Sequence, residues 1–320
     1  LSAIIDNLTA TIVLITILQK VIFKRETKLW FAGLIIISAN AGGAWSPIGD
    51  VTTTMLWIGN KVSTGNLILY VLLPSIVCFI VPAFIASMLP AFRGEIEIPE
   101  EDKSVEIHKR GATMLYLGLS SIVFVPVFKT VTHLPPYVGM MLSLSVVATF
   151  AEIFSKAKIN ITSVDVENDS HTMSGPVEKS LSKIEFTSIL FFLGILMAVA
   201  ALESLGMLFN FAENLNEVIP NLDVVIALFG IGSAIIDNVP LVAASMGMFS
   251  QPIDDPLWHL IAYSAGTGGS MLIIGSAAGV VAMGMEKIDF FWYLKKIAWL
   301  AFAGFISGFI SFILLRDFVL

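Results

Sequence analysis

Long apolar runs separated by polar connections extend along the whole chain and predict membrane-spanning helices. A helix that crosses the hydrocarbon core needs about 20 mainly apolar residues. Runs of this character cover residues 10–22, 29–57, 67–89, 113–128, 137–154, 186–205, 222–249, 257–285 and 290–315. The pattern therefore predicts an all-α polytopic membrane protein.

Three of these runs differ from a simple span. Runs 29–57 and 257–285 are longer than one crossing and contain glycines, and run 222–249 is interrupted by Asp237 and Asn238. Backbone N–H and C=O groups cannot stay unpaired in hydrocarbon, so a broken helix is tolerated only where protein or a watery cavity satisfies them. These runs predict discontinuous transmembrane helices and a re-entrant hairpin that turns back at Asp237.

Composition supports a membrane location and excludes several other classes. The chain is 56% hydrophobic and 13% charged, whereas a soluble domain has about 25% charged residues. Its formal net charge of −7 provides no basic surface for nucleic acid. The single cysteine, Cys78, has no partner for an internal disulfide, and the histidines show no metal-ligand spacing.

The distribution of Lys and Arg orients the predicted spans. Cytoplasmic loops collect basic residues. If loop 20–28 is inside and run 222–249 is re-entrant, fifteen of the 18 Lys and Arg lie inside. A full crossing by this run would instead place Lys287, Lys295 and Lys296 outside. The charges therefore favour the re-entrant hairpin.

An internal repeat relates the two ends of the chain. The hexapeptide Ser-Ala-Ile-Ile-Asp-Asn occurs at residues 2–7 and again at 233–238. After each copy, residues 38–43 correspond to 264–269, and Gly49 corresponds to Gly275. Because the charges orient the two copies oppositely, they predict inverted-topology repeats of the kind found in many secondary transporters.

The repeats divide the chain into three expected parts. Residues 1–90 form an N-terminal repeat with a hairpin remnant, a broken helix and a span, and residues 91–184 form central inside loops and two spans. Residues 185–320 form the C-terminal inverted repeat. Since the span 186–205 has no counterpart before the first copy, we expect an N-terminal segment to be missing from this sequence.

Carboxylates are the first candidates for chemistry, because a charge in a membrane interior is costly and is by default a functional hypothesis. Asp6 and Asp237 occupy equivalent hairpin tips, and Asp50 follows the break in run 29–57. Burial disfavours the charged form of a carboxyl group, so protons and Na⁺ can compete for the same carboxylates. This competition is sufficient for antiport, and we expect Na⁺ at these three aspartates.

Neutral oxygen atoms accompany the breaks, and small hard cations take oxygen ligands. The expected cation- and proton-binding set adds to the aspartates Asn7, Thr52, Thr53 and Asn238. Supporting polar or backbone groups are expected from Ser38, Asn40, Gly42, Gly43, Ser233, Ser264, Thr267, Gly268, Gly269 and Ser270. Close helix packing also explains a glycine pair, but the repetition beside a hairpin carboxylate in both copies favours an ion site.

Two segments resemble the NhaD-type Na⁺/H⁺ antiporters. They are Ser-Ala-Ile-Ile-Asp-Asn-Leu-Thr-Ala-Thr at residues 2–11 and Ser-Ala-Asn-Ala-Gly-Gly-Ala-Trp-Ser-Pro-Ile-Gly-Asp-Val-Thr-Thr-Thr-Met-Leu-Trp-Ile-Gly at residues 38–59. The resemblance continues through 191–194, 233–240 and 266–275 to the last span, so it covers nearly the whole chain. The polar residues that match are Asp6, Asn7, Asp50, Thr52, Thr53, Ser233, Asp237 and Asn238.

The resemblance implies exchange of cytoplasmic Na⁺, and of Li⁺, for external protons in a bacterial inner membrane, with highest activity at alkaline pH. It implies a multi-pass protein whose partners are the lipid bilayer and the transported ions, with no cofactor and no nucleic acid. The wider ion transporter superfamily further implies a homodimer and an elevator-like movement of the hairpin-containing part.

Two alternatives remain open. Another carrier of the same superfamily would move arsenite or a carboxylate anion, but the aspartates favour a cation. A remote alternative is an intramembrane aspartyl protease that uses Asp50 with Asp6 or Asp237, although Pro47 stands where its signature requires glycine. The chain contains no Gly-x-x-x-x-Gly-Lys-Ser/Thr loop for ATP and no Gly-x-Ser-x-Gly or His-Glu-x-x-His motif.

Overall fold

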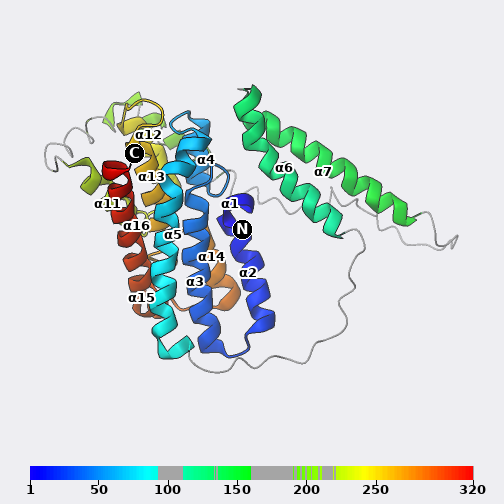
Figure 1. The fold of residues 1–320 in the computed structure, drawn as a ribbon, viewed down its shortest axis with the longest axis horizontal. Coiled ribbons are helices and arrows are strands. Elements are labelled where there is room, and N and C mark those ends of the chain that lie inside the picture. Colours follow the sequence, from blue (N-terminus) through cyan, green and yellow to red (C-terminus); the bar gives the residue numbers. More distant parts are fainter. Residues whose placement is uncertain are drawn as a thin grey trace. The chain divides into compact units, whose positions relative to one another are not determined.

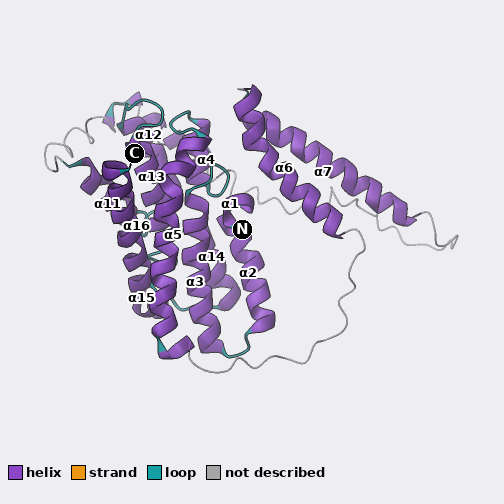
Figure 2. Ribbon diagram, in the orientation of Figure 1, coloured by secondary structure: helices purple, strands orange, loops and turns teal. Residues whose placement is uncertain are grey.

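The computed structural model describes residues 1–92, 111–132, 134, 136–159 and 221–319, together with scattered residues between 190 and 219. Every regular element within these residues is a helix (Figures 1 and 2). The described residues of 1–100 and 195–320 form one compact unit, and those of 101–194 form a second. The all-α expectation is thus confirmed for the described part, while most of run 186–205 lies outside it.

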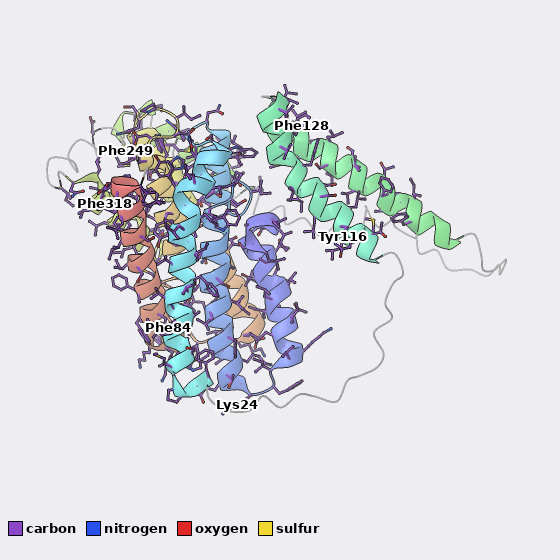
Figure 3. The ribbon with its side chains drawn as sticks, in the orientation of Figure 1. Lys24, Phe84, Tyr116, Phe128, Phe249 and Phe318 are labelled. Atoms are coloured by element: carbon purple, nitrogen blue, oxygen red, sulfur yellow. The ribbon has the colours of Figure 1, made fainter. Side chains whose placement is uncertain are left out.

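The second unit is a helix pair. Helices α6 (Gly111–Thr132) and α7 (Pro136–Ile159) pack against each other. Ser143 of α7 donates a hydrogen bond to the Ser121 carbonyl of α6 at 2.8 Å. Large apolar side chains along both helices are exposed, among them Tyr116 of α6 (Figure 3). Such surfaces are suited to lipid rather than to water.

The first unit is built from two series of helices. The N-terminal series comprises α1 (Ser2–Ile5), α2 (Asn7–Val21), α3 (Arg25–Ala44), α4 (Val51–Ile58), α5 (Thr64–Met88) and the 3₁₀ turn η1 (Pro90–Phe92). The C-terminal series comprises α11 (Leu222–Gly232), α12 (Asn238–Met248), α13 (Pro256–Gly268), α14 (Ala277–Glu286), α15 (Phe290–Lys296) and α16 (Ala298–Phe318).

Two long helices from the two series pack side by side. Helices α5 and α16 are long and apolar enough to cross a membrane, as is the segment Tyr137–Phe154 of the second unit. Close approach requires glycine, because a Cβ at Gly304 would lie 2.5 Å from Cγ of Pro82 and one at Gly308 would lie 2.5 Å from the Pro74 carbonyl oxygen. Small residues allow such contact between membrane helices.

The three atypical runs are interrupted where the sequence predicts. Run 29–57 is divided between α3 and α4, run 257–285 between α13 and α14, and run 222–249 between α11 and α12. Run 290–315 is also divided, which the sequence analysis does not anticipate, because α15 ends at Lys296 and α16 begins at Ala298. Lys295 and Lys296 lie in the last turn of α15, where basic side chains face the negative end of the helix dipole.

The two ends of the first unit carry different side chains. At one end Trp30 makes edge contacts with Phe92 and Trp292, and Lys24 of the α2–α3 connection lies at the same end (Figure 3). At the other end lie Phe249 and Phe318 (Figure 3). Aromatic side chains and lysines together are typical of a membrane–water interface. Lys24, in the basic α2–α3 connection, therefore lies at the end of the unit opposite Phe249 and Phe318 (Figure 3).

Candidate functional site

The N-terminal ends of four helices meet inside the first unit. Their N-cap residues are Asp6 for α2, Asp50 for α4, Asp237 for α12 and Ser276 for α14. Each helix N-terminus carries a partial positive charge, so anionic side chains are stabilised there. Three of the four caps are aspartates, and the fourth is a neutral serine.

Asp50 lies at the centre of this arrangement. Its side chain is buried and accepts hydrogen bonds from Asn7 Nδ2 at 3.2 Å, Asn238 Nδ2 at 3.2 Å and Thr52 Oγ1 at 2.7 Å. The donors come from α2, α12 and α4. The structure thus brings together four of the seven residues that the sequence predicts to bind the cation and the proton.

The other two aspartates flank this centre. The carboxyl groups of Asp237 and Asp6 lie near Asp50, but neither makes a described hydrogen bond with it. Asp6 instead caps its own helix, accepting from the backbone N–H of Thr9 at 3.0 Å and from its hydroxyl at 2.9 Å. The described residues contain no cluster of three acidic, His or Cys side chains that would hold a resident metal ion.

A series of hydrogen-bonded polar side chains leads from Asp50 to the break after α13. Asn7 Nδ2 also donates to Asn40 Oδ1 at 3.1 Å, and Asn40 Nδ2 donates to Ser276 Oγ at 2.9 Å. All four side chains are buried. Ser276 is absent from the site that the sequence predicts, although its correspondence with Asp50 in the repeat could have identified it.

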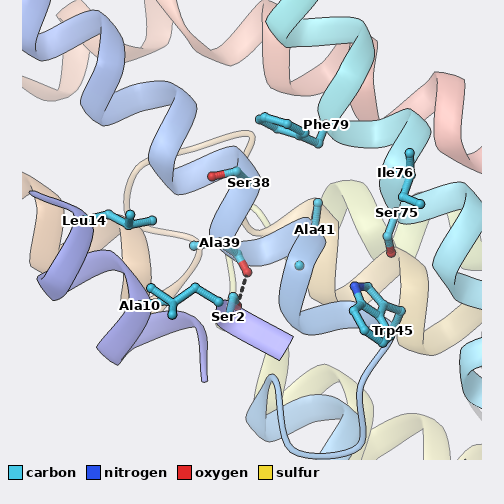
Figure 4. Close-up of a pocket in the computed structure, with 12 residues that line it drawn as sticks. Ser2, Ala10, Leu14, Ser38, Ala39, Ala41, Trp45, Ser75, Ile76 and Phe79 are labelled. Atoms are coloured by element: carbon cyan, nitrogen blue, oxygen red, sulfur yellow. Dashed lines mark hydrogen bonds between the residues drawn. The ribbon is translucent and has the colours of Figure 1, made fainter. Parts of the chain in front are cut away.

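Serine hydroxyls attach the first hexapeptide to the first broken helix. Ser2 Oγ donates to the Ala39 carbonyl at 2.5 Å (Figure 4), and Ser46 Oγ donates to the Ala3 carbonyl at 2.6 Å. Thr53, a predicted ligand, donates to the Ser46 carbonyl at 2.7 Å and not to a carboxylate. Its hydroxyl therefore satisfies an unwound carbonyl in the break.

Glycine pairs allow the same close contacts in both broken helices. A Cβ at Gly49 would lie 2.7 Å from the Gly43 carbonyl oxygen and 3.1 Å from Cα of the alanine in the first hexapeptide. A Cβ at Gly275 would lie 2.8 Å from the Gly269 carbonyl oxygen and 2.8 Å from Cα of the alanine in the second hexapeptide. Real Cβ atoms do not come so close, so both sites require glycine.

In each broken helix the first of two consecutive glycines, Gly42 or Gly268, faces the serine of a hexapeptide. A Cβ at Gly42 would lie 3.3 Å from Cβ of Ser2, and one at Gly268 would lie 2.5 Å from Oγ of Ser233. Gly42 and Gly268 thus allow close packing against the two hexapeptides, while Gly43 and Gly269 pack against Gly49 and Gly275. This is the close-packing role that the sequence analysis left open beside the ion site.

The remaining predicted side chains bond locally. Their hydroxyls donate to a carbonyl three or four residues earlier in the chain, as seen for Ser38, Ser233, Thr267 and Ser270. Ser264 Oγ is buried and has no hydrogen-bond partner among the described residues. Gly266 lies closer to the centre, since a Cβ on it would be 3.6 Å from Oδ2 of Asp50.

A pocket of about 260 Å³ lies beside the first hairpin (Figure 4). Its lining includes Ser2, Ser38 and Trp45, with Ser75 and Phe79 of α5. None of the three aspartates lines it. The pocket is therefore separate from the Asp50 carboxylate and from its three side-chain donors.

Comparison with known proteins gives a consistent assignment. A family model described as a citrate transporter, CitMHS, matches residues 1–259. Sodium/proton antiporter 1 of Arabidopsis thaliana is 44% identical over 321 residues, which cover 99% of this chain and 54% of the relative. This chain therefore spans about half the length of that relative.

Two further relatives are covered more completely. Sodium/proton antiporter 2 of Arabidopsis thaliana is 40% identical over 100% of this chain and 75% of its own length. The Na(+)/H(+) antiporter NhaD of Vibrio parahaemolyticus is 32% identical over 92% of this chain and 73% of its own length. These relatives are transporters by name, and they come from a plant and from a bacterium.

Proposed function

Because this chain belongs to the family of NhaD-type Na⁺/H⁺ antiporters, a family of multi-pass membrane transporters and not of enzymes, we propose that it exchanges Na⁺ for H⁺ and that Asp50 carries both ions in turn. The observation that carries the proposal is the Asp50 carboxylate itself. It is buried, and side chains from three helices donate to it.

Two opposing effects suit Asp50 to exchange. Burial favours the neutral acid, whereas hydrogen bonds from Asn7, Asn238 and Thr52 favour the carboxylate. The carboxyl group can therefore release one proton as one Na⁺ pairs with the carboxylate, and the reverse step restores the acid. Asp6 and Asp237 add negative charge beside this site, which attracts the cation.

A carboxylate anion is the second candidate substrate, because the matching family model is described as a citrate transporter. Helix N-termini that point at a midplane site are also typical of anion sites. In this chain, however, aspartates already cap three of the four converging N-termini. The protein itself supplies the anions, which favours a cation as the transported ion.

We further propose that the two series of helices in the first unit are inverted-topology repeats with re-entrant hairpins. The support is the recurrence of the same contacts in both copies: each hexapeptide alanine packs on a glycine of the facing break. Asp50 and Ser276 also have almost the same backbone, with φ, ψ of −151°, 150° and −151°, 152°. The repeats at residues 1–90 and 185–320 follow from this proposal.

Several finer expectations stay predictions. These are Li⁺ transport, direct Na⁺ contacts at Asp6 and Asp237, a homodimer and elevator-like movement. A bacterial inner membrane also stays a prediction, because the relatives come from a plant as well as from bacteria.

The test is ion-driven proton movement in proteoliposomes that contain the full-length protein. Addition of Na⁺ or Li⁺ is expected to dissipate an imposed pH gradient, whereas K⁺ and citrate are not. Dissipation by citrate alone would overturn the cation proposal in favour of the anion candidate.

Substitution of the central carboxylate tests its role. Asp50→Asn removes the ionisable group but keeps a similar shape, so exchange is expected to fall at least 100-fold while the protein still inserts. Asp317→Asn, at an exposed residue paired with Arg316, is the matched control and is expected to retain exchange. Wild-type exchange by Asp50→Asn would exclude Asp50 as the carrier.

A further inference from the structure

Ser276 occupies the position in the second broken helix that Asp50 occupies in the first. Both residues are N-caps of the half-helix that follows the break, with nearly the same backbone angles. Ser276 is 3% exposed and carries no charge. Its hydroxyl is therefore a buried polar group whose hydrogen bonds identify its role.

The Ser276 hydroxyl oxygen accepts two hydrogen bonds. It accepts from the backbone N–H of Gly279 at 3.2 Å, which caps α14, and from Asn40 Nδ2 at 2.9 Å. Capping alone requires only the first of these bonds. The second reaches from the second broken helix to the first, because Asn40 belongs to α3.

In this second bond the Asn40 amide turns its NH₂ group to Ser276, and loss of the hydroxyl would leave that buried NH₂ group without this acceptor. An asparagine amide has a donor side and an acceptor side. With its NH₂ group on Ser276, Asn40 presents Oδ1 to Asn7, which donates to it at 3.1 Å. The reversed amide would place two NH₂ groups against each other, and Asn7 would turn away from that contact.

Asn7 is the residue that transmits this orientation to the site. Its NH₂ group donates both to Asn40 Oδ1 and to Asp50 Oδ1, the latter at 3.2 Å. A displaced Asn7 would therefore remove one of the three side-chain donors to the carboxylate. Ser276, Asn40 and Asn7 form one continuous hydrogen-bonded chain that ends at Asp50.

The pair of residues that the repeat relates to Asn40 and Ser276 has a different chemistry. Asn40 corresponds to Gly266 in the repeat, and Gly266 faces Asp50 as Asn40 faces Ser276. The contact between the two broken helices is thus an amide with a hydroxyl in one case (Asn40 with Ser276), and a glycine with a carboxylate in the other (Gly266 with Asp50). A side chain, that of Asn40, stands beside the Ser276 hydroxyl, whereas at the corresponding position the Asp50 carboxylate faces the Cα of Gly266.

We propose that Ser276 is a positioning residue that acts through Asn40 and Asn7 to hold the Asp50 carboxylate in its cation-binding geometry. This proposal rests on the proposed function, because it concerns the same carboxylate. It adds a residue outside the predicted site. The second broken helix then helps to position a carboxylate that lies on the first broken helix.

The first experiment compares three variants in proteoliposomes. Ser276→Ala is expected to raise the apparent KM for Na⁺ about tenfold with kcat changed less than twofold. Ser276→Thr keeps the hydroxyl and is expected to restore a KM within about twofold of the wild type. Ser245→Ala, which removes a buried hydroxyl that bonds only to Leu241 of its own helix, is expected to leave KM unchanged.

A double-mutant cycle separates positioning from a general structural role. If Ser276 acts through Asn40, the pair Ser276→Ala with Asn40→Ala has the same KM as Asn40→Ala alone, because both remove the same chain. If the effects of Ser276→Ala and Asn40→Ala on KM multiply in the double variant, the two residues act independently and the proposal is overturned. A KM of Ser276→Ala equal to that of Ser245→Ala would also overturn it.

The outcomes are distinguishable from failure of the proposed function. Absence of Na⁺-driven proton movement in the wild type would reject the antiporter. If the wild type exchanges ions and Ser276→Ala has the same KM for Na⁺, only the positioning role is rejected. If Ser276→Ala does not fold, Ser276→Thr and Asn40→Ala remain as the comparison. A wild-type KM for Asn40→Ala then overturns the proposal.

Discussion

Asp6 shows how two identical hexapeptides acquire different local conformations. Its φ of 65° and ψ of 164° lie in a region that costs a non-glycine residue about 1–3 kcal/mol, whereas Asp237 has an ordinary φ of −45°. Asp6 also keeps its carboxylate on Thr9, while the Asp237 side chain makes no capping bond. Identical sequence therefore does not give the aspartates of the two hexapeptides identical hydrogen bonds.

The contact of Gly266 with Asp50 predicts that one added methyl group will change cation binding. In Gly266→Ala the new Cβ would lie 3.6 Å from Asp50 Oδ2 and 3.0 Å from Cβ of Ala44. It would narrow the space beside the carboxylate, so the KM for Na⁺ is expected to rise about tenfold and that for the smaller Li⁺ to rise less. The measurement is cation-dependent proton exchange in proteoliposomes.

The control for this substitution is Gly65→Ala. A Cβ at Gly65 meets nothing within 4 Å, so the same added methyl group is expected to leave both KM values unchanged. Equal KM values for Gly266→Ala and the wild type would show that the cation does not use the Gly266 face of Asp50.

At the scale of elements, the broken helices are in close backbone contact with the two hexapeptides. In both copies the hexapeptide approaches a glycine so closely that no Cβ fits. Apolar periodicity does not encode such a contact, because it depends on which backbone atoms face each other after folding. The positions of the interruptions are nevertheless readable from the sequence, since glycines and polar residues stand inside otherwise apolar runs.

Equivalent glycines in the two copies are expected to respond alike to alanine. Gly49→Ala and Gly275→Ala should each push a hairpin away from its break and destabilise the protein by roughly 1–3 kcal/mol, a usual cost of overpacking. Thermal unfolding in detergent measures the effect. Gly284→Ala, whose Cβ would meet nothing within 4 Å, is the control and is expected to be neutral or slightly stabilising. Destabilisation at only one of the two sites would contradict equivalent packing of the repeats.

At the scale of the whole molecule, ion pairs and aromatic contacts define the two ends of the first unit. Arg316 near the end of α16 donates to both carboxylate oxygens of Asp223 at the start of α11, at 2.7 and 2.9 Å. Phe249, which follows α12, lies at the same end as Phe318 (Figure 3). The start of α11 and the end of α12 therefore lie at one end of the unit, which is the arrangement that the proposed re-entrant hairpin requires.

Cysteine labelling tests this arrangement in a membrane. In a Cys78→Ser background, cysteines replacing Asn221 and Gln251 are expected to react with an impermeant maleimide from one side, and a cysteine replacing Lys24 from the other. Cys78 is the single cysteine of this chain, so its replacement leaves the introduced cysteines as the reactive thiols. Labelling of the Asn221 and Gln251 positions from opposite sides would show that α11 and α12 together cross the membrane.

The apolar runs, the sparse charges and the repeated hexapeptide determine by themselves that this protein is helical, that it lies in a membrane, that three of its runs are broken and that Asp50 is a functional candidate. These properties follow from local composition and spacing, because hydrocarbon tolerates neither long polar segments nor unpaired backbone groups. Only the tertiary structure decides that Asn7, Asn238 and Thr52 reach Asp50 while Asp6 and Asp237 stand beside it. It also brings in Ser276 through Asn40. Hydrogen bonds between residues far apart in the chain depend on how the helices pack, and no periodicity in the sequence records that packing.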